Sequence, residues 1–245
     1  MISKSVIGNQ SFKDLKTALQ CGEIELKGQF MLGSNYTFLV TVHRDGKETP
    51  AVYKPSRGEQ PLWDFPENSL AQREVAAYLV SEALGFHFVP YTTLREDGPH
   101  GPGSLQQYIE YDPEYHYFTF TEEDKSRLRP VMLFDLLCNN ADRKAGHVLV
   151  ENETRKLWLI DHGICFHEDD KLRTVIWDFA GQPIPDDLLA ALSPLAARDG
   201  LVSGLQRYLS PGEVTALRSR ADTLLESRVF PRPPRDRRVT PWPPL

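Results

Sequence analysis

The sequence predicts an α+β fold with a strand-rich first half and a helical second half. Three observations support this prediction: polar and apolar residues alternate before residue 55, one helical pattern occupies residues 70–84, and helical patterns dominate after residue 122. The composition, with 40% apolar and 25% charged residues, is that of an ordinary globular protein. At about 150 residues per domain, a chain of 245 residues corresponds to one or two domains.

The first half is predicted to begin as an antiparallel meander. Alternation over residues 23–32 indicates one strand, and the turn-forming residues 33–35 separate it from a second strand over 36–43. The Asp45-Gly46 pair is a hairpin signal that leads into a third strand over residues 50–54. Three consecutive strands joined by short turns are typical of a meander.

A helix and two more strands complete this half. The apolar spacing over residues 70–84 predicts a helix that Ser69 caps and Gly85 ends. Residues 89–96 and 104–111 then resemble strands on either side of a glycine- and proline-rich loop.

The second half is predicted to be mainly helical. One amphipathic helix is expected over residues 122–138, followed by a polar loop and two short strands over 147–151 and 156–160. Ser210 and Glu213 have the spacing of a capping box. Further helices are expected near residues 186–197, 200–209 and 211–228.

Charge and composition exclude several classes of protein. The net charge of −6 argues against nonspecific nucleic-acid binding as the main role. No stretch approaches the ~20 apolar residues of a membrane span, and the first twenty residues lack the apolar region of a secretory signal. Three widely separated cysteines do not form a disulfide framework, which favours a cytoplasmic location. Residues 231–245 contain six prolines and four arginines and predict an extended tail, either disordered or laid over a surface.

Five charged residues occur in an order that suits phosphoryl transfer. Lys54 ends the third strand, and Glu74 lies twenty positions later on the helix, so an ion pair could hold the ammonium against the α- and β-phosphates of ATP. Asp142 lies in the polar loop and would accept the proton of the attacking hydroxyl, while Lys144 would face the γ-phosphate. Asp161 ends a strand and would bind Mg²⁺, which prefers oxygen ligands.

These motifs resemble a known superfamily. VYKP, the Arg-Glu pair on the helix, NNADRKAGHVLV and LIDHGICF are similar to motifs of phosphatidylinositol 3- and 4-kinase-like proteins. The small atypical members are the best match: type II phosphatidylinositol 4-kinases, HipA-type bacterial kinases and a bacterial family of about 250 residues. The resemblance covers residues 20–210. It implies a bilobal protein-kinase-like fold, ATP and Mg²⁺ as ligands in a cleft between the lobes, and a hydroxyl acceptor that is a protein, a small metabolite or a lipid.

The resemblance also assigns domains and residue roles. The N-lobe would comprise residues 1–110 and the C-lobe residues 111–230, followed by the tail. In the superfamily an asparagine binds the second metal where this chain has His147, so Mn²⁺ could replace Mg²⁺. Ser34 and Asn35 lie in the turn that would cradle phosphates. Tyr108 and Ile109 lie in the expected hinge, whose backbone would pair with adenine.

Other interpretations of the same residues remain open. His147 and the glycine-poor turn also suit a nucleotide-binding pseudokinase or regulatory module. The histidines His147, His162 and His167 with Asp161 suit a metal-dependent hydrolase, although no common zinc-site spacing is present. Arg143 is expected to be structural, pairing with a carboxylate in the C-lobe. Asn139 and Asn140 are expected to cap the preceding helix, with one of them positioning the catalytic aspartate.

Overall fold

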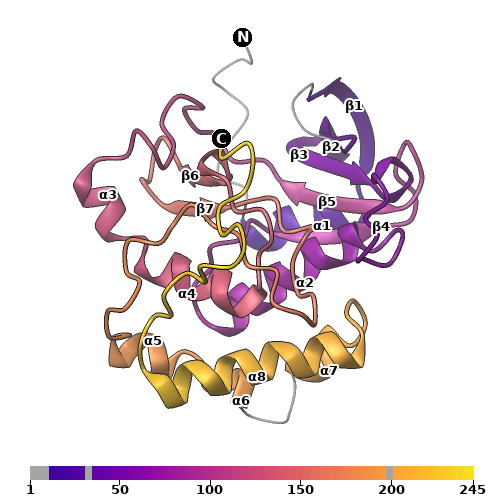
Figure 1. Ribbon diagram of the computed structural model, residues 1–245. Helices are drawn as coiled ribbons and strands as arrows, with labels where there is room; N and C mark the ends of the chain where they lie inside the picture. The colour runs from indigo at the N-terminus through magenta and orange to yellow at the C-terminus, as the bar shows by residue number, and fades with distance from the viewer. Residues whose placement is uncertain (1–10, 31–34, 197–200) are drawn as a thin grey trace. The chain divides into compact units, whose positions relative to one another are not determined.

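The computed structural model describes residues 11–30, 35–196 and 201–245, which form two compact units (Figure 1). Unit 1 runs up to Val75 and resumes over Pro90–Ile109. Unit 2 comprises Ala76–Val89 and Glu110–Leu245. The architecture is α+β, as predicted. The chain crosses between the units three times: between Val75 and Ala76, between Val89 and Pro90, and between Ile109 and Glu110.

Unit 1 is built on a five-stranded antiparallel sheet with the strand order β1-β2-β3-β5-β4. The predicted meander is confirmed: Asp45 and Gly46 both have positive φ, as a tight hairpin turn between β2 and β3 requires. Lys54 lies near the end of β3, opposite Ser104 on β5. The strands are β1 (Glu23–Gln29), β2 (Phe38–Arg44), β3 (Lys47–Pro55), β4 (Thr92–Arg95) and β5 (Gly103–Gln107).

A helix not predicted from the sequence precedes this sheet. The helix α1 (Phe12–Cys21) is capped by the Ser11 side chain, which accepts a hydrogen bond from the Asp14 N–H. It buries Leu15 and Leu19 and contacts β2, β3, β4 and β5. The polar face of α1 contains two lysines, so the average hydropathy of the segment is low. The narrow apolar stripe was therefore not recognised as a helical pattern.

The helix α2 (Leu70–Ala83) forms where the sequence predicts it, but its start is capped differently. The Glu59 carboxylate accepts the N–H groups of Leu70 and Ala71 at 3.2 and 3.1 Å. Ser69, the expected cap, instead donates its hydroxyl to the Pro66 carbonyl. An acidic group suits this position because helix N-termini carry positive partial charge.

Unit 2 contains two short strands and most of the helices. The predicted helix over residues 122–138 is in fact two helices, α3 (Glu122–Ser126) and α4 (Arg129–Cys138), because Pro130 has no N–H to donate and sits in the first turn of α4. The helix expected over 186–197 is divided in the same way, with Pro194 in the first turn of its second part. The remaining elements are η1 (Ser56–Gly58) in unit 1 and η2 (Ala145–His147), β6 (Val148–Val150), β7 (Leu157–Leu159), α5 (Asp186–Ala190), α6 (Ser193–Ala196), α7 (Leu201–Leu205) and α8 (Pro211–Ser227) in unit 2.

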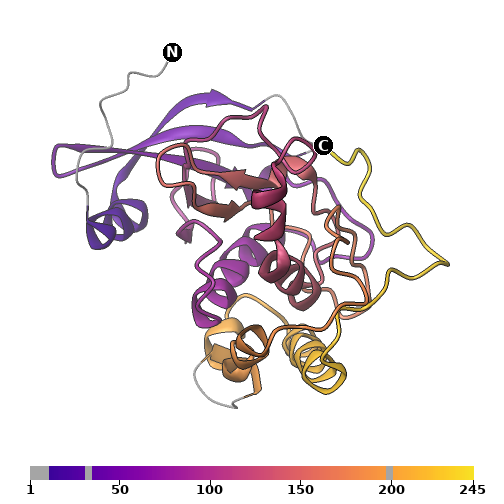
Figure 2. The same cartoon turned by 90° about the vertical axis from the view of Figure 1, so that its left-hand side faces the viewer.

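The helix α8 and the segment after it lie at the periphery of unit 2 (Figure 2). The predicted capping box is present, since the Ser210 hydroxyl accepts from the Glu213 N–H and the Glu213 carboxylate accepts from the Ser210 N–H. α8 packs on α4 and α6. The segment 231–245 has no helix or strand and lies on unit 2. Within the described ranges, no helix is both long and apolar enough to cross a membrane.

Candidate active site

In unit 1 the predicted ion pair between Lys54 and Glu74 is formed. Lys54 projects from β3 and Glu74 from the second turn of α2. The Glu74 side chain is 3% exposed and that of Lys54 is 22% exposed, so the ammonium keeps access to solvent. A buried carboxylate needs a charged partner, and here the partner is the ammonium of Lys54.

Two other segments predicted to bind the nucleotide, the turn containing Asn35 and the stretch containing Tyr108, form hydrogen bonds within unit 1. The Asn35 side-chain oxygen accepts the Gln60 N–H at 2.7 Å, which ties the turn before β2 to the loop after β3. Ser34 lies outside the described residues. The Tyr108 N–H donates to the Pro50 carbonyl at 3.3 Å, and Ile109 is buried. An adenine at this stretch would therefore have to pair with backbone groups other than the Tyr108 N–H.

In unit 2 the loop after α4 presents Asp142 and Lys144. Asn139 ends α4 in the left-handed conformation. Asn140 accepts the Asp142 N–H at 2.9 Å through its side-chain oxygen, so it fixes the backbone of the aspartate as predicted. The Lys144 ammonium lies 3.6 Å from the Asp142 carboxylate.

Asp142 is a carboxyl group with a strongly perturbed titration. Burial raises its pKa from 3.8 to about 6. Lys144 and Arg173 oppose this effect, whereas the negative charge of Asp161 adds to it. A carboxylate with a pKa close to neutrality is suited to accept a proton and to release it again. The shift also indicates that Asp142 and Asp161 interact electrostatically.

Asp161 and His147 form the second half of this group. Asp161 follows β7 with a φ of 62°, a conformation that aspartate adopts more readily than most residues. His147 closes the η2 turn, and its Nε2 lies 3.3 Å from the Asp161 carboxylate. Its Nδ1 accepts the Lys144 N–H at 3.4 Å. The Asp161 side chain is 49% exposed and that of His147 is 14% exposed, so the carboxylate is open to a ligand.

A fully buried arginine connects these residues. Arg143 is 0% exposed and pairs with Asp135, which confirms the structural role predicted for it. Its guanidinium also donates to the carbonyl oxygens of Ile160 at 2.8 Å and His147 at 3.3 Å. A fourth partner is His162, whose Nε2 lies 2.8 Å from the guanidinium. Arg143 therefore binds both residues that flank Asp161, as well as the residue at the end of η2.

Asp135 was not identified from the sequence. It lies in α4 with no exposed surface, and it accepts hydrogen bonds from Arg143, the Thr174 hydroxyl and the Asn140 amide. Burial raises its pKa, and these three partners oppose that effect. The sequence does contain a signal for this residue: Asp135 is the single acid within the apolar run VMLFDLLC. Because a charged side chain is hardly ever buried without a partner, an acid in such a run indicates a buried ion pair.

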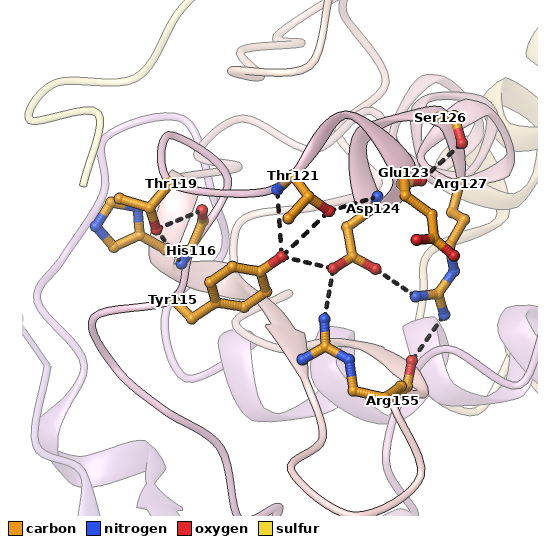
Figure 3. Close-up of polar contacts among 9 residues, drawn as sticks. All are labelled: Tyr115, His116, Thr119, Thr121, Glu123, Asp124, Ser126, Arg127 and Arg155. Carbon is orange, nitrogen blue, oxygen red and sulfur yellow. Dashed lines mark hydrogen bonds and ion pairs between the residues drawn. The ribbon is translucent and has the colours of Figure 1, made fainter.

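A second buried acid orders the aromatic segment over residues 111–121 (Figure 3). Asp124 on α3 accepts hydrogen bonds of 2.6 Å from Tyr115, Arg127 and Arg155. The same segment contacts the loop that follows Asp142, since the Tyr117 N–H donates to the Ala145 carbonyl at 3.4 Å. Figure 3 shows that Asp124 joins Tyr115 of this segment to Arg127 and Arg155.

The histidines expected in a hydrolase site do not come together. His162 is buried against Arg143, and His167 contacts Asp169 instead. Throughout the described ranges, no group of three or more His, Cys, Asp or Glu side chains is arranged to hold a metal ion. Zinc hydrolases use three protein ligands, so this geometry gives the hydrolase alternative no support.

The fold is that of a kinase. The Helicobacter pylori proinflammatory kinase CtkA matches 86% of this chain and 94% of its own, with a TM-score of 0.53 and 13% identity. The Golgi casein kinase with Mn/ADP bound matches 92% of this chain and 80% of its own, with a TM-score of 0.55 and 14% identity. The structure of hydra Fam20 with sugar has a TM-score of 0.55 over 93% of this chain and 92% of its own, at 14% identity. At these identities the likeness concerns the fold alone.

The sequence places the chain in a family. It belongs to the same family as Protein Rv2133c of Mycobacterium tuberculosis, with 38% identity over 94% of this chain and 95% of the relative. It is 26% identical to phosphatidylinositol 4-kinase gamma 4 of Oryza sativa over 65% of this chain. The chain spans 36% of the length of that rice protein. No family model matches the chain.

Proposed function

We propose that this protein is an ATP-dependent phosphotransferase that moves the γ-phosphate of ATP to a hydroxyl group. The observation that carries the proposal is Asp142, whose pKa of about 6 suits a general base. The proposal is also supported by the contacts of Asp142, since Asn140 accepts the Asp142 N–H and the Lys144 ammonium lies 3.6 Å from the Asp142 carboxylate. The kinase fold of the structural neighbours and the weak sequence similarity to plant phosphatidylinositol 4-kinases support the proposal.

The proposed roles divide between the two units. In unit 1, Glu74 holds the ammonium of Lys54, which binds the α- and β-phosphates. In unit 2, Asp142 accepts the proton of the attacking hydroxyl, and Lys144 neutralises charge on the transferred group. The bond from the γ-phosphorus to the bridging oxygen of ADP breaks as the bond to the acceptor oxygen forms.

Asp161 and His147 are the residues proposed to hold a divalent cation. A half-exposed carboxylate beside an imidazole nitrogen is a chemically suitable pair of donors, and phosphate oxygens and water complete such sites. The cation would neutralise negative charge on the phosphates. The imidazole must present Nε2 to the ion, so the proton would reside on Nδ1 and the hydrogen bond from the Lys144 N–H would be given up. This exchange is possible because that hydrogen bond, at 3.4 Å, is long.

The test is transfer of labelled γ-phosphate from ATP in the presence of Mg²⁺ or Mn²⁺. We expect the unaltered protein to label an acceptor, itself included, and Asp161→Ala to lose at least about 99% of this activity because the phosphate charge is no longer neutralised. Thermal unfolding checks that the variant remains folded. ATP binding without transfer by the unaltered protein would contradict the proposal and favour the pseudokinase alternative.

The metal preference is expected to depend on His147. Imidazole nitrogen binds Mn²⁺ more readily than Mg²⁺, whereas an amide oxygen suits both. His147→Asn should therefore raise the ratio of Mg²⁺-supported to Mn²⁺-supported activity, by about threefold or more if the ligand contributes ~0.7 kcal/mol to the discrimination. The measurement is initial rate against the concentration of each metal, with His87→Asn as the control because His87 is an exposed histidine. An unchanged ratio would remove His147 from the metal site.

The finer family links are proposals as well. A place in the phosphatidylinositol 3- and 4-kinase-like superfamily is supported by the loop containing Asp142 and by the similarity to the rice protein. The proposed relation to HipA-type kinases rests on the sequence of that loop alone. The acceptor is proposed only as a hydroxyl compound. An acceptor screen with labelled ATP, run side by side with Asp142→Ala, would identify its chemical class.

A further inference from the structure

The proline- and arginine-rich segment 237–245, which we name the strap, is anchored to unit 2 at three places. The first anchor is Arg237. Its guanidinium donates to the Leu172 carbonyl at 2.8 Å and forms an ion pair of 2.7 Å with Asp170. The sequence predicted only that such a tail would be disordered or would lie on a surface, and the contacts identify the surface: the stretch that follows Asp161.

The second anchor is the Val239 carbonyl oxygen, which accepts two hydrogen bonds. One comes from the Thr174 N–H at 3.0 Å and the other from Nε1 of Trp177 at 3.2 Å. Backbone and ring thus hold the same oxygen from two sides. A carbonyl oxygen with two donors has both lone pairs satisfied.

The third anchor lies on the catalytic loop itself. The Pro244 carbonyl oxygen accepts the Ala145 N–H at 2.8 Å, and the Leu245 side chain lies beside Gly146. Ala145 is the first residue of η2, the turn that ends at His147. In Figure 1 the yellow segment after α8 returns toward β6, which directly follows this turn.

The second anchor is also connected to the catalytic loop, through Thr174 and its neighbours. Thr174 donates its hydroxyl to the Asp135 carboxylate at 3.1 Å, the same carboxylate that binds Arg143. The neighbouring backbone pairs with Arg143 on both sides: the Arg143 N–H donates to Arg173, and the Val175 N–H donates to Arg143. The segment 173–175 therefore lies between the strap and the residue that follows Asp142.

We propose that the strap is a positioning element of the active site, and this inference rests on the proposed function. It holds η2 directly through Ala145 and holds the backbone of Arg143 through residues 173–175. These contacts hold the first residue, Arg143, and the middle residue, Ala145, of the short loop over residues 143–147. That loop carries Lys144 and His147, and Asp142 immediately precedes it. Without the strap, the loop retains its sequence but loses the partner of the Ala145 N–H.

The test compares three variants of the full chain. Deletion of residues 240–245 removes the third anchor, and Arg237→Ala removes the first anchor without shortening the chain. Arg235→Ala is the matched control, because it removes the same charge from an exposed position two residues before the strap. Each variant is measured by hydrogen exchange at the Ala145 and Thr174 amides, by thermal unfolding, and by the kcat and KM for ATP.

For the deletion we expect the Ala145 amide to exchange at least about tenfold faster, with kcat about tenfold lower and the KM for ATP little changed. Arg237→Ala should accelerate exchange at Thr174, and the control should match the unaltered protein. A synthetic peptide of residues 237–245 should restore protection of Ala145 and part of the kcat of the deletion variant.

Two results would overturn the proposal. One is unchanged exchange at Ala145 after the deletion, because the strap would then not hold the loop. The other is an increase in kcat, because the strap would then obstruct the site instead of positioning it. Hydrogen exchange does not require turnover. Absence of phosphate transfer by the unaltered protein would therefore refute the proposed function only. The exchange rate of the Ala145 amide would still show whether the strap holds the loop.

Discussion

Replacement of Asp142 by asparagine is expected to abolish phosphoryl transfer and, at neutral pH, to stabilise the protein. The loss of activity should be about 100-fold or more, which is the usual contribution of a general base. The gain in stability follows from the raised pKa of Asp142, since a carboxylate that burial disfavours costs free energy in the folded state. An amide of the same shape has no charge to bury.

The raised pKa of Asp142 determines how the stability of the protein changes with pH. The folded-state pKa of about 6 lies above the usual value of 3.8, so the folded protein binds this proton more tightly than the unfolded chain does. Stability is therefore lost as pH rises from about 4 to about 6 and stays lower above that range. Asp142→Asn should raise the melting temperature at pH 7.5, and the difference should vanish near pH 4.

The rate should follow the same ionisation. As the proposed base, Asp142 would act only when it is deprotonated, so kcat/KM should fall tenfold per pH unit below about 6. The charges that set this pKa are those of Lys144, Arg173 and Asp161. Asp222→Asn on the exposed side of α8 is the matched control, and it should change neither rate nor stability. A destabilised Asp142→Asn at pH 7.5 would show that the carboxylate makes a net favourable contact.

Lys54 and Asp135 show which site residues could be predicted from the sequence and which could not. Lys54 and Glu74 were predictable as a pair because a strand end and the start of a helix fix their positions within two local elements. Asp142 and Asp161 were predictable as polar residues placed after a buried helix and a buried strand. Asp135 was not, because its partner is eight residues away through a loop whose path local patterns do not define.

Other differences have the same origin. Glu59 caps α2 from eleven residues upstream, so the local capping signal at Ser69 pointed to the wrong residue. Pro130 divides a segment whose apolar periodicity is otherwise continuous. The contacts of residues 237–245 were not predictable, because proline-rich composition indicates an extended chain and says nothing about the surface it occupies.

The second large effect is expected at the buried pair of Arg143 and Asp135. Both side chains have no exposed surface, so removal of the arginine leaves an uncompensated carboxylate in the interior. Arg143→Met should lower the free energy of unfolding by about 3–5 kcal/mol. Urea unfolding at pH 7.5 measures it, and Arg207→Met, at an exposed position, is the control. A loss below about 1 kcal/mol would mean that Asp135 is already neutral in the folded protein.

The double variant Arg143→Met with Asp135→Leu separates stability from activity. It removes both buried charges, so much of the lost stability should return, as is common when apolar residues replace a buried ion pair. Activity should not return with it. Arg143 also binds the carbonyl oxygens of His147 and Ile160, and no methionine can replace those hydrogen bonds. A stable double variant with full phosphate transfer would contradict this view, because the positions of His147 and Asp161 would then not depend on the guanidinium.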